Sequence, residues 1–232
     1  MELNQPIRLI AFDADDTLWD CQSFFFDVER QYCELLAAYG DEDHISQELF
    51  KTETANMAEL GYGCKAFTLS LVENAIRVSN GLIAANYLLE IQELGRSLLR
   101  LPATPLPEVE DTLKILKTQE SYQLVVFTKG ELQDQENKLK RSGLLKYFDD
   151  VEITSDKTQR EFLALCEHQQ IHPSQLLMVG NSLKSDCAPA LAIGAWAIHI
   201  PFHVTWQLEH FEDIDHERLI KIEKFSDILK YI

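Results

Sequence analysis

Short apolar segments recur along the chain, and amphipathic segments of helical period separate most of them. A short, almost continuous apolar run is typical of a strand that is buried on both faces of a sheet. The sequence predicts such strands at residues 7–12, 124–127, 151–154, 176–179 and 196–200. Amphipathic stretches at residues 132–142, 159–169 and 185–193 separate the last four strands. This alternation predicts an α/β fold, a Rossmann-like parallel sheet flanked by helices.

The segment between the first two predicted strands is different, because it shows only helical periodicity. Helices are predicted at residues 26–39, 46–60, 68–79 and 83–99. A crossover between parallel strands needs about a dozen residues or somewhat more, so this segment is several times longer than required. We therefore expect an inserted all-helical domain over residues 20–101 and an α/β core domain made of residues 1–19 and 102–232.

The composition is that of a soluble globular protein. The chain has 232 residues, of which 46% are hydrophobic and 25% are charged, and its formal net charge is −17. This acidic balance argues against nucleic acid or an anionic membrane surface as a main partner, since both attract lysine and arginine. No apolar run approaches the ~18 residues of a membrane-spanning helix. A small phosphate-bearing substrate remains compatible, because local cations and a bound divalent metal can dominate the local field.

The cysteine usage points to a reducing compartment. The five cysteines are odd in number and widely spaced, and no two form a Cys-x-x-Cys pair. Free thiols fit this pattern better than a disulfide framework or a zinc site. The N-terminal residues also lack the basic and apolar regions of a signal peptide. We therefore expect a cytoplasmic protein, and the sequence makes no prediction about its oligomeric state.

The first predicted strand runs directly into a cluster of acids. Asp13 and Asp15 stand at positions i and i+2 of extended chain and so face the same side, and Asp16 follows. Ligands bind at this end of the strands in an open parallel sheet. Clustered carboxylates repel each other, and a divalent cation offsets that repulsion. Taken alone, the acids also fit a turn in which an aspartate caps a helix.

The later strands end in further polar residues. In chain order these are Thr128, Lys129 and Gly130, then Lys157, then Asn181 and Asp186. A hydroxyl followed by backbone N–H groups around a glycine can bind a phosphate. Each group also has an ordinary structural interpretation, as a loop, a solvated lysine or a helix cap.

The order of these groups resembles the motifs of the haloacid dehalogenase-like (HAD) hydrolase superfamily. The chain carries Asp-x-Asp-x-Thr, then Thr, then Lys, then Gly-Asn-x-x-x-x-Asp, each after its own strand. The resemblance covers the whole chain, and the helical insertion is similar to the α-helical cap of that family. It implies a phosphatase in which Asp13 attacks phosphorus and forms an aspartyl-phosphate. Asp15 would protonate the leaving group and then accept a proton from water.

The resemblance also implies roles for the other groups. Thr128, Lys129 and Gly130 would bind the transferring phosphoryl group. Lys157 would act in catalysis by pairing with both the phosphate and Asp13. A magnesium ion would be held by Asp13, by Asp15 through its backbone carbonyl, by Asn181 and by Asp186.

Two features bear on the metal and the substrate. Family members usually carry aspartate where Asn181 stands, and an amide oxygen is a neutral and weaker ligand for magnesium. In HAD proteins of this cap type, a loop between cap helices reaches the active site and selects the substrate. Tyr62 and Lys65 are therefore candidates for substrate contact, with a plain interhelical turn as the alternative.

The sequence thus predicts a magnesium-dependent phosphatase for a small, soluble phosphate monoester. A nucleoside monophosphate, a sugar phosphate and phosphoglycolate all remain open as substrates. A 2-haloacid dehalogenase is a second interpretation, but a halide leaves without a proton, so Asp15 would have no task. A catalytically silent phospholigand-binding protein is a third, and Asn181 is the one hint for it.

Overall fold

The computed structural model describes residues 6–232, which form two compact units. One unit comprises the described residues up to Gln22 together with Ala103–Ile232, and the other comprises Ser23–Pro102. The first five residues, on which part of the signal-peptide expectation depends, lie outside the described range. Within residues 6–232, no helix combines the length and the apolar character needed to cross a membrane.

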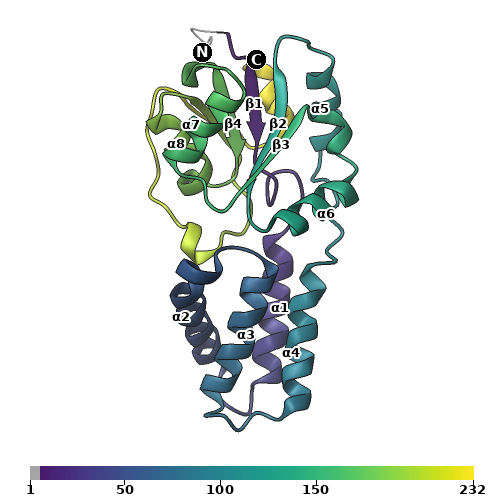
Figure 1. Ribbon diagram of the computed structural model, residues 1–232, viewed down its shortest axis with the longest axis vertical. Helices are drawn as coiled ribbons and strands as arrows, with labels where there is room; N and C mark the ends of the chain where they lie inside the picture. Colours follow the sequence, from purple (N-terminus) through teal and green to yellow (C-terminus); the bar gives the residue numbers. More distant parts are fainter. Residues whose placement is uncertain (1–5) are drawn as a thin grey trace. The chain divides into compact units, whose positions relative to one another are not determined.

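The first unit is built on a six-stranded sheet with the order β3-β2-β1-β4-β5-β6 (Figure 1). Every neighbouring pair in it is parallel, which confirms the predicted α/β fold class. The last strand was not predicted, because its three residues are too short an apolar run to be recognised. In chain order the strands are β1 Leu9–Phe12, β2 Gln123–Lys129, β3 Asp150–Thr154, β4 Leu176–Gly180, β5 Trp196–His199 and β6 Leu219–Lys221.

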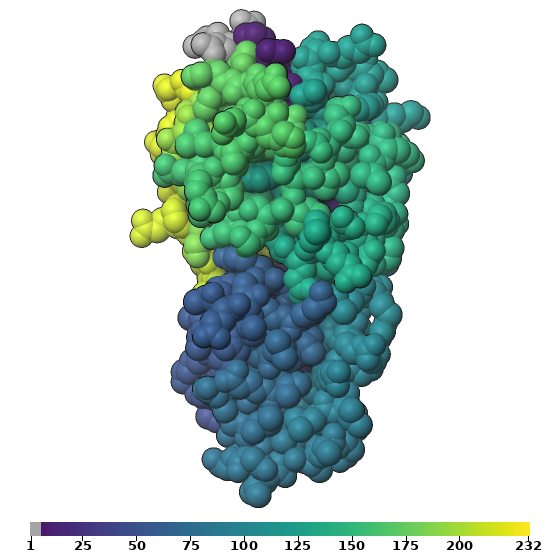
Figure 2. All heavy atoms as spheres, viewed as in Figure 1, coloured from purple at the N-terminus to yellow at the C-terminus, as the bar shows by residue number. Residues whose placement is uncertain are grey.

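Helices cover both faces of this sheet, because successive strand residues point to opposite faces and both sets are apolar. On one face the rings of Phe127 and Phe162 lie 4.9 Å apart, and the segments of α7 and α8, in green, close over it (Figure 2). On the other face the ring of Phe12 stacks on Phe225 at 5.8 Å. The helices of this unit are α5 Val109–Lys117, α6 Leu132–Ser142, α7 Gln159–His168 and α8 Ala188–Ala192.

Two helical regions of this unit differ from the prediction. The nine-residue α5 was not predicted, because periodicity identifies a helix reliably only over longer windows. The helix predicted over residues 185–193 is instead a π-helical turn, Leu183–Cys187, followed by the short α8. Such wide turns are rare and are often found at functional sites.

The second unit is formed by helices, one in each of the four segments where the periodicity predicts them. They are α1 Gln22–Leu35, which begins at the last residue of the first unit, α2 Glu42–Leu60, α3 Cys64–Val78 and α4 Ala85–Leu98. Their apolar faces share one buried core that includes Leu49, Leu71 and Ile91. The buried hydroxyl of Tyr32 donates a hydrogen bond to the carbonyl of Leu71 at 3.0 Å.

Helices α3 and α4 approach each other closely at Gly95. A Cβ atom at this position would lie 2.2 Å from Oγ1 of Thr68. That hydroxyl is itself held by a 2.6 Å hydrogen bond to the carbonyl of Cys64, so it cannot move away freely. The packing of the two helices therefore requires a glycine at this position.

We expect Gly95→Ala to lower the free energy of unfolding by about 2 kcal/mol. Alanine gains about 1 kcal/mol in helix propensity, but overpacking costs up to about 3 kcal/mol where the neighbour cannot move. Urea unfolding followed by circular dichroism measures the difference. The same substitution in a Thr68→Ala background should cost less, and an equal cost in both backgrounds would contradict the packing explanation.

Candidate active site

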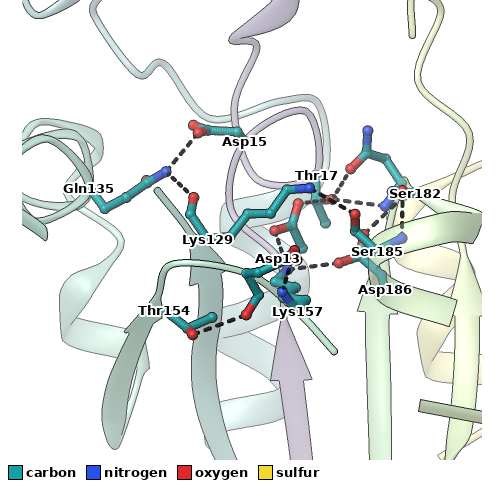
Figure 3. Close-up of polar contacts among 12 residues, drawn as sticks. Asp13, Asp15, Thr17, Lys129, Gln135, Thr154, Lys157, Ser182, Ser185 and Asp186 are labelled. Carbon is teal, nitrogen blue, oxygen red and sulfur yellow. Dashed lines mark hydrogen bonds and ion pairs between the residues drawn. The ribbon is translucent and has the colours of Figure 1, made fainter. Parts of the chain in front are cut away.

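Three of the predicted site residues meet in one buried cluster of charges (Figure 3). Nζ of Lys157 lies 2.5 Å from Oδ1 of Asp13 and 2.7 Å from Oδ1 of Asp186. The side chain of Lys157 is 1% exposed, and those of the two acids are 10% and 2% exposed. One lysine therefore bridges two carboxylates that follow different strands, β1 and β4.

In this cluster two carboxylates share one buried cation, the ammonium group of Lys157. Burial and the neighbouring carboxylate of Asp186 raise the pKa of Asp13 to about 7, although Lys157 acts in the opposite direction. Burial also opposes the charge on Lys157, but the two carboxylates outweigh it and hold the pKa of Lys157 above its usual value. The cluster carries an excess of negative charge whenever both acids are ionised.

Gly180, the last residue of β4, leaves the space that Asp186 occupies. A Cβ atom on Gly180 would lie 2.2 Å from Oδ2 of Asp186. The same oxygen accepts a hydrogen bond from the backbone N–H of Ser182 at 3.0 Å. The strand therefore ends in a glycine because any side chain there would displace the buried acid.

Thr17 connects Asp13 with Asn181. Its Oγ1 atom lies 3.2 Å from Oδ2 of Asp13 and 3.2 Å from Oδ1 of Asn181, and it accepts the backbone N–H of Asn181 at 3.1 Å. A hydroxyl has one proton, so Thr17 can donate to only one of these two oxygens at a time. The structure thus places Asn181 beside the charged cluster.

Asp15 is held by a different set of partners. Its carboxylate accepts hydrogen bonds from Nε1 of Trp19 at 2.7 Å, from Nε2 of Gln135 at 2.8 Å and from Nζ of Lys138 at 2.6 and 2.8 Å. Burial acts to raise the pKa of Asp15, but the charge and hydrogen bonds of Lys138 and the other donors outweigh it, so the pKa lies below its usual value. In Figure 3 the side chain points toward Gln135 and away from Lys157.

The third acid of the motif, Asp16, closes the turn that follows β1. Its Oδ1 atom accepts the backbone N–H groups of Cys21 and Gln22, each at 2.8 Å. Its φ of +62° places it in the left-handed region, where aspartate is better tolerated than most residues. The structural interpretation of a turn with a capping aspartate therefore holds for Asp16.

Two of the residues predicted to bind phosphate have contrasting surroundings. Thr128 is 2% exposed, and its hydroxyl has no hydrogen-bond partner within residues 6–232. A ligand could supply that partner. The backbone N–H of Gly130, by contrast, already donates to the carbonyl of Thr154 at 3.0 Å.

The third residue of this group, Lys129, forms a network that the sequence reasoning missed. Its Nζ atom lies 2.5 Å from Oε1 of Glu209 and 2.8 Å from Oγ of Ser185. Oε2 of Glu209 accepts the hydroxyls of Ser182 and Ser185, each at 2.6 Å. Glu209 belongs to a 3-10 turn of a loop, and nothing local distinguishes it among the 38 acidic residues of the chain. It ties the end of β2 to the turn that carries Asp186.

The two candidates for substrate contact lie in the second unit. Tyr62 is half-buried between α2 and α3, and Lys65 is exposed in the first turn of α3. Their contact with a substrate stays a prediction.

The donor atoms of the core cluster suit a hard divalent cation. Asp13, Asp186 and Asn181 offer carboxylate and amide oxygens, which are the ligands that magnesium prefers. The two acids have one lysine between them, so a cation would offset the remaining negative charge. The residues present therefore fit the predicted metal.

A second group of potential metal ligands lies apart from these motifs. Ligand atoms of Asp150 and Glu152 on β3 and of His168 on α7 lie within 4.8 Å of one another. Nδ1 of His168 contacts Oε1 of Glu152, and Gln169 donates to Asp150 at 2.7 Å. These contacts already satisfy the group, and none of its residues belongs to the predicted site.

Fold and site together define the class of the protein. A parallel α/β sheet carries an Asp-x-Asp motif after a central strand, and a buried lysine joins that motif to an acid after the neighbouring strand. The family model for haloacid dehalogenase-like hydrolases matches residues 7–194, and the chain belongs to this family. The resemblance noted in the sequence is thereby confirmed.

Curated relatives and a solved structure agree with this assignment. The chain is 26% identical over 205 residues to the glyceraldehyde 3-phosphate phosphatase of Methanothermobacter thermautotrophicus, covering 86% of this chain and 88% of the relative. It is 29% identical over 218 residues to a phosphoglycolate phosphatase of Vibrio vulnificus, covering 90% and 89%. The crystal structure of a haloacid dehalogenase-like hydrolase from Xanthomonas campestris matches with a TM-score of 0.87 at 32% identity, covering 97% of this chain and 89% of that chain.

We expect Lys157→Met to destabilise the fold, because it leaves Asp13 and Asp186 buried without their shared cation. Removal of one partner from a buried charge pair costs about 3–5 kcal/mol. If a divalent cation binds the same carboxylates, the loss is smaller in magnesium than in EDTA. Urea unfolding in both buffers measures it.

A matched control is Lys146→Met, which breaks an exposed pair with Glu110. It should change the free energy of unfolding by at most about 0.5 kcal/mol in either buffer. Equal losses for Lys157→Met in magnesium and in EDTA would contradict a metal site at these two acids.

Proposed function

We propose that the chain is a magnesium-dependent phosphatase that hydrolyses a small phosphate monoester through an aspartyl-phosphate. The observation that carries the proposal is the buried cluster of Asp13, Lys157 and Asp186 at the carboxyl ends of the strands. A carboxylate beside a fixed cation can approach an anionic phosphoryl group, which an unscreened carboxylate would repel. The two curated relatives, both phosphatases, support the same activity.

The chemistry divides into two displacements at phosphorus. In the first, the carboxylate of Asp13 attacks, the bond from phosphorus to the ester oxygen breaks, and Asp15 gives a proton to the departing alkoxide. This step needs the protonated form of Asp15, which the contact with Lys138 disfavours in the resting site. In the second, water attacks phosphorus, the bond from phosphorus to the oxygen of Asp13 breaks, and Asp15 takes a proton from the water. This step releases inorganic phosphate and restores the carboxylate of Asp13. Lys157 screens the charge of Asp13 and pairs with the phosphoryl group.

The remaining residues bind the phosphoryl group and the metal. Thr128 is a buried residue, and its hydroxyl is a donor without a protein partner among the described residues, which supports a phosphate contact. The ammonium group of Lys129 is paired with Glu209. Lys129 would therefore contact the phosphoryl group through its backbone, beside Gly130. Magnesium, when bound, supplies positive charge that offsets the charge developing on the phosphoryl oxygens. Its ligands would be Asp13, the backbone carbonyl of Asp15, Asn181 and Asp186.

The substrate that we propose is a small aliphatic phosphate ester. The printed names of the two curated relatives refer to glyceraldehyde 3-phosphate and phosphoglycolate, which are both of this class. We assign the helical unit as the cap, with Tyr62 and Lys65 as substrate contacts. Rates for these two esters, a hexose phosphate and a nucleoside monophosphate would test this choice, and a preference for the nucleotide would contradict it.

We expect Asp13→Asn to abolish turnover without changing the fold, because an amide cannot form the acyl-phosphate. Residual hydrolysis of p-nitrophenyl phosphate should lie below about a hundredth of that of the unmodified chain. The assay is run with magnesium and with EDTA, and circular dichroism checks the fold. Activity that EDTA leaves intact would contradict the metal requirement. Chloride release from a 2-haloacid would instead identify a dehalogenase. If the chain turns over neither the phosphate ester nor the haloacid, it is a binding protein.

We expect Asn181→Asp to lower the magnesium concentration for half-maximal activity. At ~4 Å and an effective dielectric of ~20, an added unit charge interacts by about 4 kcal/mol per cation charge. Repulsion from Asp13 and Asp186 and the desolvation of the new carboxylate cancel much of this. A tenfold shift needs a net gain of only about 1.4 kcal/mol.

The opposite substitution provides the control for this prediction. Asn181→Ala removes the oxygen donor and should raise the magnesium midpoint. If neither variant moves the midpoint, Asn181 has a structural role, and Asp186 would be the one side-chain ligand from that loop.

A further inference from the structure

The loop between β5 and β6 places one shielded acid against the turn that carries Asp186. This loop spans residues 200–218, in which the 3-10 turn Gln207–Glu209 is the one regular element. The side chain of Glu209 is only 14% exposed, whereas that of Glu217 in the same loop is 80% exposed. Glutamate is one of the residues least often buried, so the position of Glu209 needs a physical reason.

Glu209 contacts the turn through two serine hydroxyls. Its Oε2 atom accepts the O–H groups of Ser182 and Ser185, each at 2.6 Å, while its Oε1 atom is paired with Nζ of Lys129. Burial acts to raise the pKa of Glu209, but the charge of Lys129 and these hydrogen bonds outweigh it, so the pKa lies below its usual value. Glu209 is therefore a carboxylate that can accept both hydroxyls at once.

The serines connect this carboxylate to the residues proposed to hold magnesium. Oγ of Ser182 also accepts the backbone N–H of Ser185 at 2.9 Å, which fixes the start of the turn. The backbone N–H of Ser182 donates to Oδ2 of Asp186 at 3.0 Å (Figure 3). Ser182 directly follows Asn181 in the chain, so its position helps to set those of both predicted ligands. A displacement of Glu209 would be transmitted to both.

This arrangement is a costly way to attach a loop. The side chains of Lys129 and Glu209 are 16% and 14% exposed, and charges that leave water lose their hydration. Apolar side chains of similar volume often serve stability at least as well. The turn that the pair contacts, Leu183–Cys187, is π-helical, a rare conformation that is often found at functional sites. The cost of the pair and its place on this turn together indicate a role in the site.

We propose that Glu209 is a positioning residue for the magnesium ligands Asn181 and Asp186. It acts through the hydroxyls of Ser182 and Ser185 and is not itself a ligand. Such contacts fix the ligands before the metal arrives, and their removal typically costs about 10–100-fold in metal affinity. The inference rests on the magnesium requirement of the proposed function and is independent of which ester is the substrate.

The test measures the binding of Mg²⁺ to the full chain by isothermal titration calorimetry, without a substrate. Glu209→Ala should weaken this binding by about tenfold. Glu209→Gln keeps an oxygen that can accept the serine hydroxyls, and Lys129 keeps its contact with Ser185. The glutamine variant should therefore bind magnesium about threefold more tightly than the alanine variant.

The comparison of these two variants separates positioning from simple loss of charge. Both remove the same negative charge, so a purely electrostatic effect of Glu209 on the cation would weaken binding equally in the two. Equal affinities of Glu209→Gln and Glu209→Ala for Mg²⁺ would therefore overturn the positioning role.

A double-mutant cycle tests the route through the serines. The combined change Ser182→Ala and Ser185→Ala removes both hydroxyls but leaves the backbone contact with Asp186 possible. In that background Glu209→Ala should change the magnesium affinity by less than about twofold, because the groups through which it acts are gone. An undiminished effect of Glu209→Ala there would contradict the inference.

The free energy of unfolding in EDTA separates this role from a merely structural one. A structural anchor would lower that free energy when removed but leave the magnesium affinity of the folded chain unchanged. The exposed Glu217 of the same loop is the matched control, and Glu217→Ala should change neither quantity. If Glu209→Ala does not fold, Ser185→Ala replaces it and should weaken magnesium binding by about threefold, and an unchanged affinity would overturn the inference.

The outcomes also separate this inference from the proposed function. If the unmodified chain binds no magnesium, the metal requirement and this inference both fail. If it binds magnesium and Glu209→Ala binds it equally well, only the positioning role fails. If the variants behave as expected but the chain hydrolyses no phosphate ester, the proposed reaction fails and the positioning role stands.

Discussion

The contacts of Lys157 with Asp13 and Asp186 are the interaction on which the rest of the core site depends. Burial of three charges is favourable only where the geometry is close and complete, and the distances of 2.5 and 2.7 Å meet that requirement. Lys157 follows β3, yet the acids follow β1 and β4, so the ion pairs need the strand order β3-β2-β1-β4. They also need the glycine at the end of β4, because a side chain there would displace Asp186. The order of the strands and one charge interaction thus support each other.

The same principle recurs twice around this cluster. Lys138 holds Asp15, and Lys129 holds Glu209, and in both pairs the partner comes from a segment far away in the sequence. Each of these lysines is used to place an acid rather than to provide a general positive field. A site built in this way has fixed donors and acceptors but little spare positive charge for a phosphate. This is the physical reason why a divalent cation belongs in the proposed reaction.

Local pattern determined a large part of the fold. Short, mostly apolar runs identify β1 to β5, and helical periodicity identifies the helices α1 to α4, because both signals are repeated over neighbouring positions. The order of Asp13, Thr128, Lys157 and Asp186 after successive strands indicated the site, since the carboxyl ends of parallel strands share one edge of a sheet. The signal failed where an element is short, as in the nine residues of α5 and the three of β6.

Tertiary structure alone decided what each polar group contacts. Asp13, Asp15 and Asp16 are close in the sequence, yet Asp13 faces Lys157, Asp15 faces α6 and Asp16 caps a turn. The sequence predicts Lys129 as a phosphate ligand but does not reveal that its Nζ atom pairs with Glu209, 80 residues further along. Lys138 lies 123 residues from Asp15, and nothing near it in the sequence indicates that the two are in contact. Periodicity and motifs report which residues are buried and where strands end, but an ion pair depends on two side chains that only the folded chain brings together.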